Sequence, residues 1–311
     1  MKIFTTGGTG FIGSYVVKTL SDAGHQITVL ARNPEKVPAL RKLPGVSLVK
    51  GKINDKNVIS KTIAGSEVCI HIALHWGDSA VEMLLNDTHS SVQLFELAAK
   101  AGVKEIIYTS STAVNDWIYM DSNARELGEK NTVYDNTKQR PVTYYGATKG
   151  ATELFLNAVA FNYNLKFNII RPGYTFGNPV VPGASTQSDT RFAEIVKKAV
   201  RGESIELVKN DGTQFIWAGD LAEIYLAVME SEKNGKMYFG LGDKFITWES
   251  IARETVSMLG SESKILVKDM GWTDKPALFD VSGIERDFCF SFSSWERIKE
   301  HIRYYITQFQ Q

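Results

Sequence analysis

The feature that most constrains the fold is a regular alternation of short apolar runs with helical patterns along the first half of the chain. The runs are rich in β-branched residues, and we predict a buried strand over each of 2–6, 26–31, 46–50, 67–73, 105–110 and 167–172. Helical spacing of apolar residues predicts helices over 11–24, 33–42, 54–65, 81–102 and 143–163. Strands that alternate with helices form a parallel sheet covered on both faces, so we expect a doubly wound α/β domain over residues 1–171.

The pattern changes after Pro172. Residues 173–190 are rich in Gly, Pro, Ser and Thr and predict a long loop, which in a compact domain is commonly functional. Further helices are predicted over 191–201, 221–230 and 248–259, with short strands over 204–208 and 236–240. We expect residues 172–311 to form a smaller α/β substrate-binding domain, with segments at about 212–240 returning to the first domain.

Composition narrows the possible partners and the compartment. The 35 basic and 35 acidic residues balance, which argues against a nucleic-acid or anionic-membrane footprint. Cys69 and Cys289 lie far apart without metal-ligand spacing, so we interpret them as reduced core thiols and predict no metal site. No run of residues reaches membrane-spanning length, and the first residues lack the charged segment followed by a long apolar stretch that is typical of a secretory leader. We therefore expect a cytoplasmic protein that acts on a small molecule.

A glycine cluster stands where the first strand meets the first helix. In TTGGTGFIG, both Gly8-x-Gly10-x-x-Gly13 and Gly7-x-x-Gly10-x-x-Gly13 fit a dinucleotide-binding fingerprint. The missing side chains let the backbone approach a pyrophosphate, and the helix N-terminus offers free N–H groups to it. The alternative is a glycine-rich turn without a ligand. The βαβ context favours cofactor binding.

The end of the second strand indicates which dinucleotide binds. An acidic residue there accepts hydrogen bonds from the adenine ribose of NAD, whereas an arginine accommodates the 2′-phosphate of NADP. Here Ala31 occupies the position of the acid and Arg32 follows it, with Lys36 nearby. A planar guanidinium suits a phosphate dianion, so the pattern favours NADP over NAD. The alternative is a solvated cation at a strand end.

Tyr145 and Lys149 are four residues apart and share one face of the helix predicted over 143–163. Ser110, Ser111 and Thr112 follow the fifth strand, at the sheet edge where open α/β folds bind ligands. A lysine beside a tyrosine stabilises the phenolate, so this set predicts a proton-transfer unit. Alternatively, the Tyr–Lys pair is a surface helix pair and the hydroxyls cap the strand end. Tyr144 competes with Tyr145 but has no lysine four residues on.

The motifs TGGTGFIG, YTSST and YYGATK, in this order, resemble the extended short-chain dehydrogenase/reductase family, the NAD(P)-dependent epimerase/dehydratase group. The resemblance covers nearly the whole chain. It implies that Ser111 orients the substrate, that Tyr145 is the general acid/base, and that Lys149 lowers the tyrosine pKa and contacts the nicotinamide ribose. It also implies a homodimer formed through the long helices. The candidate cofactor-binding residues are Gly7, Gly10, Phe11, Ile12, Gly13, Arg32, Ile53, Ala73, Tyr145, Lys149 and Pro172.

Three departures from the family pattern bear on the substrate. Lys52 stands where the family usually carries an acid near the adenine, although Ile53 could still pack on the ring. Tyr174 and Gln214 stand where nucleotide-sugar enzymes often carry an asparagine and a phosphate-binding arginine. Without those partners a nucleotide diphosphate is harder to hold, unless Arg191 compensates. Arg32 resembles the arrangement in ketone-reducing members such as dihydroflavonol reductases, again pointing to NADP.

Several further residues have two interpretations. His71, His75 and Trp76 follow the fourth strand and could face the cofactor, but a lone histidine is more often structural. The polar insertion over 113–142 is either a substrate lid or a solvated excursion. Trp217 and Trp248 are more typical of packing than of chemistry. The candidate substrate contacts are His75, Thr112, Tyr174 and Arg191.

The leading functional hypothesis is an NAD(P)-dependent oxidoreductase that acts on a secondary alcohol or ketone, with Tyr145 as the general acid/base. A second hypothesis is an NAD-dependent epimerase or dehydratase of a nucleotide sugar, although Asp116 is the only acid near the serines for a dehydration. A third, from another class, is a dinucleotide sensor without catalysis. The intact Ser111, Tyr145 and Lys149 argue against it, because a sensor has no need of a proton-transfer unit.

Overall fold

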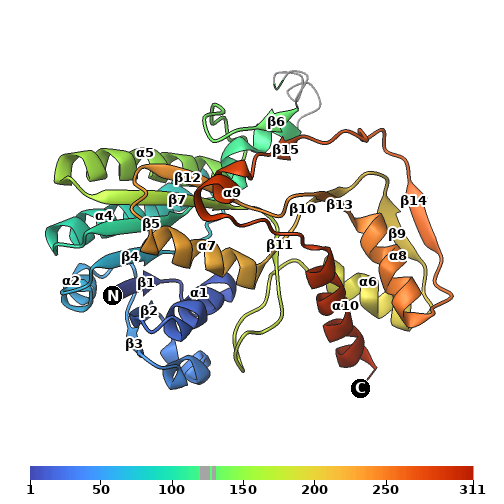
Figure 1. Cartoon of the computed structure of the whole chain (residues 1–311), viewed down its shortest axis with the longest axis horizontal. Helices are drawn as coiled ribbons and strands as arrows, with labels where there is room; N and C mark the ends of the chain where they lie inside the picture. Colours follow the sequence, from blue (N-terminus) through green and yellow to red (C-terminus); the bar gives the residue numbers. More distant parts are fainter. Residues whose placement is uncertain (120–126, 128–130, 311) are drawn as a thin grey trace.

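A seven-stranded parallel sheet forms the centre of the computed structural model, which describes residues 1–119, 127 and 131–310 (Figure 1). Its strand order is β12-β7-β5-β4-β1-β2-β3. The strands are β1 (Lys2–Thr6), β2 (Gln26–Ala31), β3 (Val46–Lys50), β4 (Val68–His71), β5 (Glu105–Thr109), β7 (Lys166–Pro172) and β12 (Lys236–Gly240). All six predicted strands of the first half are present, and the predicted doubly wound α/β class is confirmed.

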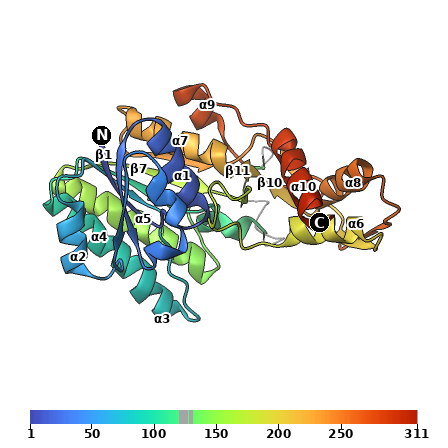
Figure 2. The same cartoon turned by 90° about the horizontal axis from the view of Figure 1, so that it is seen from below.

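Helices cover both faces of the sheet, as Figure 2 shows. Helices α1 (Phe11–Asp22) and α7 (Ala218–Glu230) share one apolar core with the strands, and α2 (Lys56–Ile63), α4 (His89–Lys100) and α5 (Tyr144–Tyr163) share the other. Each layer buries the apolar stripe of its helices, which explains why the strands between them are apolar on both sides.

The chain order reverses between β1 and β4, which are neighbours in the sheet. The strands β2 and β3 extend the sheet to one side of β1, and β4, β5 and β7 extend it to the other. Open parallel sheets bind ligands in the crevice outside the carboxyl ends of their strands at such a reversal. The glycine cluster follows β1, and Ser111 lies just beyond β5, so both predicted motifs lie at this edge.

A second lobe lies to the right in Figure 1 and has its own aromatic core around Phe176, Phe192, Phe215 and Trp248. Its elements are β8 (Thr175–Phe176), α6 (Arg191–Val200), β9 (Ile205–Val208), β10 (Gly212–Gln214), β11 (Ile216–Trp217), β13 (Phe245–Thr247), α8 (Trp248–Leu259), β14 (Ile265–Lys268) and α10 (Trp295–Phe309). Thr247 caps α8 through its side chain, and Gly260 ends it in the left-handed conformation. Trp248 is buried in this core, as its packing interpretation predicts.

The remaining elements join the insertion to the end of the chain. The short strand β6 (Thr132–Val133) pairs in parallel with β15 (Leu278–Phe279), which precedes α9 (Ser282–Phe288). Val133 is buried, so this part of the 113–142 insertion is packed rather than solvated. Residues 120–126 and 128–130, which belong to the same insertion, lie outside the described residues.

Three local predictions differ from the structure in detail. The helix expected over 33–42 is replaced by two 3₁₀ turns, η1 (Pro34–Lys36) and η2 (Pro38–Lys42), because each proline starts a turn and lacks the N–H that a continuous helix needs. The helix expected over 81–102 contains α3 (Ala80–Met83), a π-helical turn η3 (Leu84–Thr88) and α4. The edge strand β3 is only partly buried, since it has a neighbour on one side alone.

Two further expectations are corrected. Cys289 is exposed at the C-terminal end of α9 in the left-handed conformation, and only Cys69 is a core thiol. Within residues 212–240, α7 and β12 join the main sheet and its helices, whereas β10 and β11 pair with β13 and β8 outside it. The helices α9 and α10 were not predicted.

Across residues 1–119, 127 and 131–310, none of the helices combines the length and apolar content that a membrane crossing requires. The same residues hold no group of three or more His, Cys, Asp or Glu side chains arranged to bind a metal ion.

Candidate active site

The glycine cluster forms a tight cradle between β1 and α1. Gly7 has a φ of +76°, and a Cβ there would lie 2.5 Å from the backbone nitrogen of Ala73. A Cβ on Gly13 would lie 2.1 Å from the Gly7 carbonyl oxygen, so neither position accepts a side chain. Gly10 caps α1 without a side-chain hydrogen bond, and the first turn carries no acidic residue. The first N–H groups of α1 are therefore available to an anion, which fits the pyrophosphate of a dinucleotide.

The other predicted cofactor residues lie at the ends of neighbouring strands. Arg32 directly follows β2, is exposed, and makes no hydrogen bond or ion pair to any described residue. Ile53, just beyond β3, packs against the core shared with α2. Ala73 follows β4 and donates its backbone N–H to Thr6 Oγ1 at 3.4 Å. Pro172 is the last residue of β7 and is buried.

Ser111, Tyr145 and Lys149 come together beyond the carboxyl end of β5. The Ser111 side chain lies close enough to the Tyr145 hydroxyl to oppose the increase that burial causes in the pKa of that phenol. Lys149 is buried on α5 and donates from Nζ to the Thr109 carbonyl oxygen at 3.2 Å. Its Nζ lies 6.0 Å from the centre of the Tyr145 ring. Tyr144, the competing tyrosine, is exposed, whereas Tyr145 is half-buried beside Lys149.

A buried carboxylate that the sequence analysis did not identify faces this lysine. Asp87, in the π-helical turn η3, has Oδ2 at 3.8 Å from Lys149 Nζ. Its Oδ1 accepts the backbone N–H of His75 at 3.1 Å. Single π-helical turns occur frequently at functional sites. No spacing rule links Asp87 to Lys149, because the pair forms only when α5 packs on η3.

Burial dominates the electrostatics of the site. It raises the pKa of Tyr145, the Ser111 side chain opposes the increase, and the Asp87 carboxylate adds to it. Burial lowers the pKa of Lys149, while the carboxylates of Asp87 and Glu153 raise it. In the protein alone the pKa of Tyr145 is therefore raised, whereas the motif predicted that Lys149 lowers it. The ammonium faces Asp87 as well as the phenol, so the phenolate needs positive charge from elsewhere to form near neutral pH.

The start of α5 is fixed by Thr143 and Asp116. Thr143 accepts the N–H of Gly146 at 3.0 Å, a typical N-cap. Asp116 Oδ1 accepts the N–H of Val142 at 2.7 Å, and Oδ2 accepts the N–H and hydroxyl of Thr143 at 3.2 and 2.6 Å. Both oxygens of Asp116 are thus engaged in holding the turn before Tyr145. This arrangement makes Asp116 a positioning group and weakens its candidacy as the acid of a dehydratase.

The residues after β4 divide into a structural group and an exposed one. His71 is buried, with Nδ1 at 2.6 Å from Thr6 Oγ1 and Nε2 at 2.8 Å from Ser91 Oγ. Burial lowers the pKa of His71 to about 3, so it is a neutral, structural imidazole. His75 is exposed, and its backbone rather than its ring contacts Asp87. Trp76 is also exposed, and its ring stacks on that of Tyr145.

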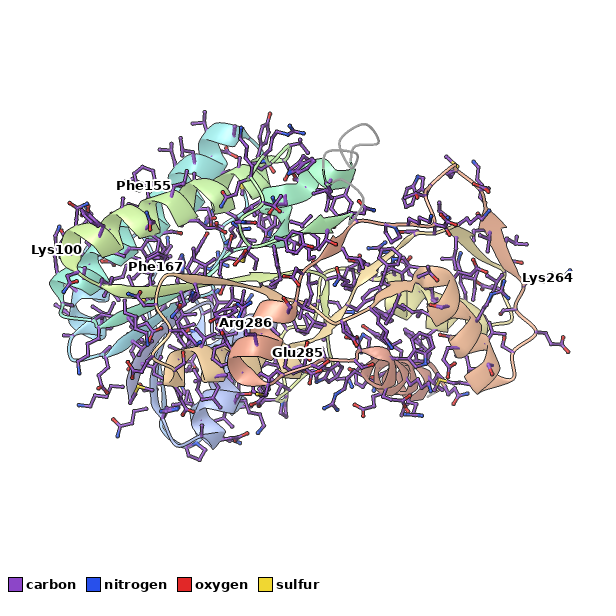
Figure 3. The ribbon with its side chains drawn as sticks, turned by 45° about the horizontal axis from the view of Figure 1, so that its top comes forward. Lys100, Phe155, Phe167, Lys264, Glu285 and Arg286 are labelled. Atoms are coloured by element: carbon purple, nitrogen blue, oxygen red, sulfur yellow. The ribbon has the colours of Figure 1, made fainter. Side chains whose placement is uncertain are left out.

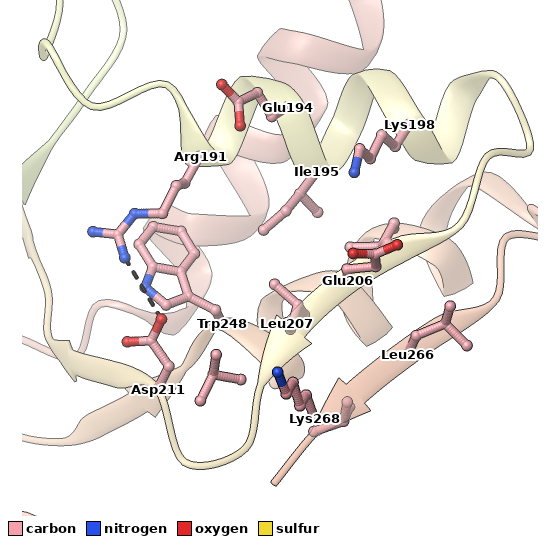
Figure 4. Close-up of a pocket in the computed structure, with 13 residues that line it drawn as sticks. Arg191, Glu194, Ile195, Lys198, Glu206, Leu207, Asp211, Trp248, Leu266 and Lys268 are labelled. Atoms are coloured by element: carbon pink, nitrogen blue, oxygen red, sulfur yellow. Dashed lines mark ion pairs between the residues drawn. The ribbon is translucent and has the colours of Figure 1, made fainter. Parts of the chain in front are cut away.

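Tyr174 and Arg191 contact each other in the second lobe, and Arg191 lines a cavity of about 640 Å³ there (Figure 4). The Arg191 guanidinium lies 4.4 Å from the centre of the Trp248 ring and 5.5 Å from that of Tyr174. It donates to Asp189 at 2.7 to 3.1 Å and lies 3.7 Å from Asp211. Two carboxylates therefore already balance its charge. Thr112 starts the turn η4 (Thr112–Tyr119) beside Ser111 and is half-buried.

Gln214 stands where nucleotide-sugar enzymes often carry a phosphate-binding arginine, and its side chain makes three hydrogen bonds to the protein backbone. Its amide nitrogen donates to the carbonyl oxygens of Gly242 and Phe279, each at 3.1 Å, and its amide oxygen accepts the N–H of Phe279 at 2.7 Å. The side chain is buried. It ties β10 to the segments around Gly242 and Phe279, and because both of its N–H groups are used it has no donor left for a phosphate.

The chain resembles known proteins in sequence and in fold. The model of the NAD dependent epimerase/dehydratase family matches residues 3–239. A putative dihydroflavonol 4-reductase from Synechocystis is 25% identical over 83% of this chain and 69% of its own. A UDP-glucose 4-epimerase from Neisseria meningitidis serogroup B is 31% identical, over 51% of this chain and 48% of its own. The crystal structure of UDP-glucuronic acid 4-epimerase from Bacillus cereus with NAD superposes with a TM-score of 0.80 at 18% identity, covering 99% and 100% of the two chains.

Proposed function

Because this chain belongs to the NAD dependent epimerase/dehydratase family, and is thus an enzyme of the extended short-chain dehydrogenase/reductase type, we propose that it interconverts a secondary alcohol and a ketone with NADP(H). The observation that carries the proposal is the placement of Tyr145, Ser111 and Lys149 beside the glycine cradle at one sheet edge. The dihydroflavonol reductase relative supports this reaction class.

The cradle residues and the first turn of α1 would hold the pyrophosphate, and Lys149 would hold the nicotinamide ribose. When bound, the nicotinamide supplies or accepts the hydride. Ser111 orients the substrate oxygen, and the Tyr145 hydroxyl donates the proton to it in reduction or takes it back in oxidation. Lys149, held by the Thr109 carbonyl and facing Asp87, keeps a positive charge near the phenol. Ser111 thus positions the substrate oxygen, Tyr145 exchanges the proton with it, and Lys149 supplies charge beside Tyr145.

Three features argue against a nucleotide-sugar substrate. Gln214 has no free N–H donor for a phosphate, and the charge of Arg191 is already balanced by Asp189 and Asp211. Asp116, the one acid near Ser111 that the sequence offered for a dehydration, caps the start of α5. A diphosphate carries two negative charges that would lack partners in this lobe.

The second candidate is NAD-dependent epimerisation of a nucleotide sugar. The 31% identity to a UDP-glucose 4-epimerase favours it, although that match spans only half of either chain. Purified protein should be assayed with NADPH or NADH and a panel of ketones, and separately with UDP-glucose. Consumption of NADPH with a ketone supports the reductase. NAD retained through purification, with conversion of UDP-glucose and no net cofactor consumption, would overturn it.

The Arg32→Ala variant tests the NADP preference. Loss of a charge-assisted contact to the 2′-phosphate should weaken NADPH binding by about 10- to 100-fold and leave NADH binding unchanged. Isothermal titration with both cofactors measures this. Arg41→Ala is the matched control, because Arg41 is exposed nearby but paired with Glu35 at 3.0 Å. Equal losses for both cofactors, or none, would contradict Arg32 as the phosphate reader.

The same proposal assigns cofactor binding and substrate binding to different lobes. Residues 1–171, with α7 and β12, bind the cofactor, and the rest of 172–311 binds the substrate. We keep a cytoplasmic location as part of the proposal, supported by the two free thiols of Cys69 and Cys289.

A homodimer is the proposed assembly. The outer face of α5 exposes Leu154, Phe155 and Phe161, the last 88% exposed, and α3 and η3 expose Val81 and Leu84. Figure 3 shows Phe155 pointing away from the core. Exposed apolar groups gathered on packed helices mark a protein interface. Sedimentation should give a dimer for the native chain and a monomer for Phe161→Glu, while Phe309→Glu, on α10, should remain dimeric. A native monomer would contradict the assignment.

A further inference from the structure

Trp76 is an exposed aromatic side chain in direct contact with the proposed acid/base. Its ring lies 5.0 Å from the Tyr145 ring, centre to centre, at an interplanar angle of 30°. Although this stack covers part of the indole, the residue remains 65% exposed. Leaving so large an apolar ring in water forgoes the free energy that burial provides. An exposed tryptophan at the phenol that handles the substrate proton is therefore placed to meet a ligand.

The backbone that carries Trp76 is fixed on both sides. The N–H of His75 donates to Asp87 Oδ1 at 3.1 Å, the N–H of Gly77 to Met83 Sδ at 3.0 Å, and the N–H of Asp78 to a Glu82 carboxylate oxygen at 2.8 Å. A Cβ at Gly77 would lie 2.7 Å from Glu82 Cβ, so the segment packs tightly on α3. The indole is presented by an anchored segment, and little ordering entropy would be lost when a ligand covers it.

The chemistry of this surface selects for flat, apolar groups. An indole binds aromatic rings through offset stacking or edge-to-face contact. Resting on the proposed oxidoreductase function, we propose that Trp76 is a specificity-determining residue that binds an aromatic or conjugated ring attached to the reacting carbon of the substrate. The substrate class is then an aryl ketone or the corresponding aryl carbinol. Ser111 and Tyr145 hold the oxygen, and Trp76 contacts the ring.

Two ketones of matched size test the assignment, acetophenone and cyclohexyl methyl ketone. They share the acetyl group and differ in whether the ring is flat. Equilibrium binding of each to the protein saturated with NADP⁺ should favour acetophenone by about 3- to 10-fold, the scale of one aromatic contact. Trp76→Ala should abolish the preference by weakening acetophenone alone, and Trp76→Phe should retain most of it. Trp272→Ala, which removes another half-exposed tryptophan, should leave it unchanged.

Three outcomes would overturn the proposal. The native protein could bind the two ketones equally or bind neither, or Trp76→Ala could weaken both to the same degree, as a purely structural role requires. A loss of NADP⁺ affinity in Trp76→Ala that matches the loss for acetophenone would assign the ring to the cofactor instead. The oxidoreductase proposal can fail separately. If the protein prefers acetophenone in binding but turns over neither ketone, the proposed reaction is wrong and the role of Trp76 in binding aryl groups still holds.

Discussion

Replacement of Tyr145 by phenylalanine is expected to lower kcat by about 10²- to 10⁴-fold, the usual contribution of a positioned general acid/base. The substitution removes one oxygen atom and keeps the ring that stacks on Trp76. Fold and cofactor binding should therefore persist, with the Kd for NADPH changed by no more than about twofold. Rates of NADPH consumption, together with cofactor titration by fluorescence, separate these two quantities.

The neighbouring residue provides a matched control. Tyr144 is exposed on the same turn of α5 and should tolerate phenylalanine without loss of activity. A Tyr145→Phe enzyme that keeps more than about a tenth of native kcat would reject Tyr145 as the proton donor. The opposite pattern, with Tyr144→Phe inactive and Tyr145→Phe active, would exchange the roles of the two tyrosines.

Replacement of Glu153 by glutamine is expected to have the largest effect on stability, lowering the free energy of unfolding by about 3–5 kcal/mol. Glu153 is buried on α5 and pairs with buried Arg171 of β7 through two hydrogen bonds, at 2.9 and 2.6 Å. Asn115 adds a third contact to the guanidinium at 3.3 Å. The amide would leave the arginine charge buried without its counter-ion. Thermal and urea unfolding of both proteins measure the difference.

A double variant shows whether the loss of stability comes from the unpaired buried charge of Arg171. Glu153→Met combined with Arg171→Met removes both charges and should be markedly more stable than Glu153→Gln, since apolar replacements of a buried pair are often tolerated. Arg253→Gln breaks an exposed pair with Glu249 on α8 and should cost less than about 1 kcal/mol. If Glu153→Gln cost no more than this surface variant, the buried pair would contribute little.

What the sequence predicted well depended on local patterns. The six strands, the glycine cluster and the Tyr145–Lys149 pair are each defined within a few residues, and the topology of alternating strands and helices then brings them to one edge. The family was predicted correctly from three short motifs in the right order. Such signals are independent of how distant segments pack.

The features that the sequence analysis missed or predicted wrongly depend on how distant segments of the chain pack together. Asp87 meets Lys149, and Trp76 meets Tyr145, only through packing of the segment after β4 against α5. Arg191 was considered as a partner for a phosphate, but its ion pairs with Asp189 and Asp211 inside the second lobe already balance its charge. The exposure of Cys289 follows from the left-handed end of an unpredicted helix. No pattern within a short window contains this information.

The strand β12 and the helix α7 complete the first lobe, although both come after residue 171 in the sequence. A fragment ending at residue 171 would leave β7 as a bare sheet edge and uncover the face of α1 that α7 shields (Figure 1). Such a fragment exposes an unpaired edge strand and an apolar surface, both of which promote aggregation, so we do not expect it to fold as a stable domain by itself. The second lobe is built from two segments of the chain, one between β7 and α7 and the other after β12, and both are attached to the same central sheet. If the second lobe binds the substrate, as proposed, recombination that exchanges these two segments would change the ligand and leave the sheet and its helices whole.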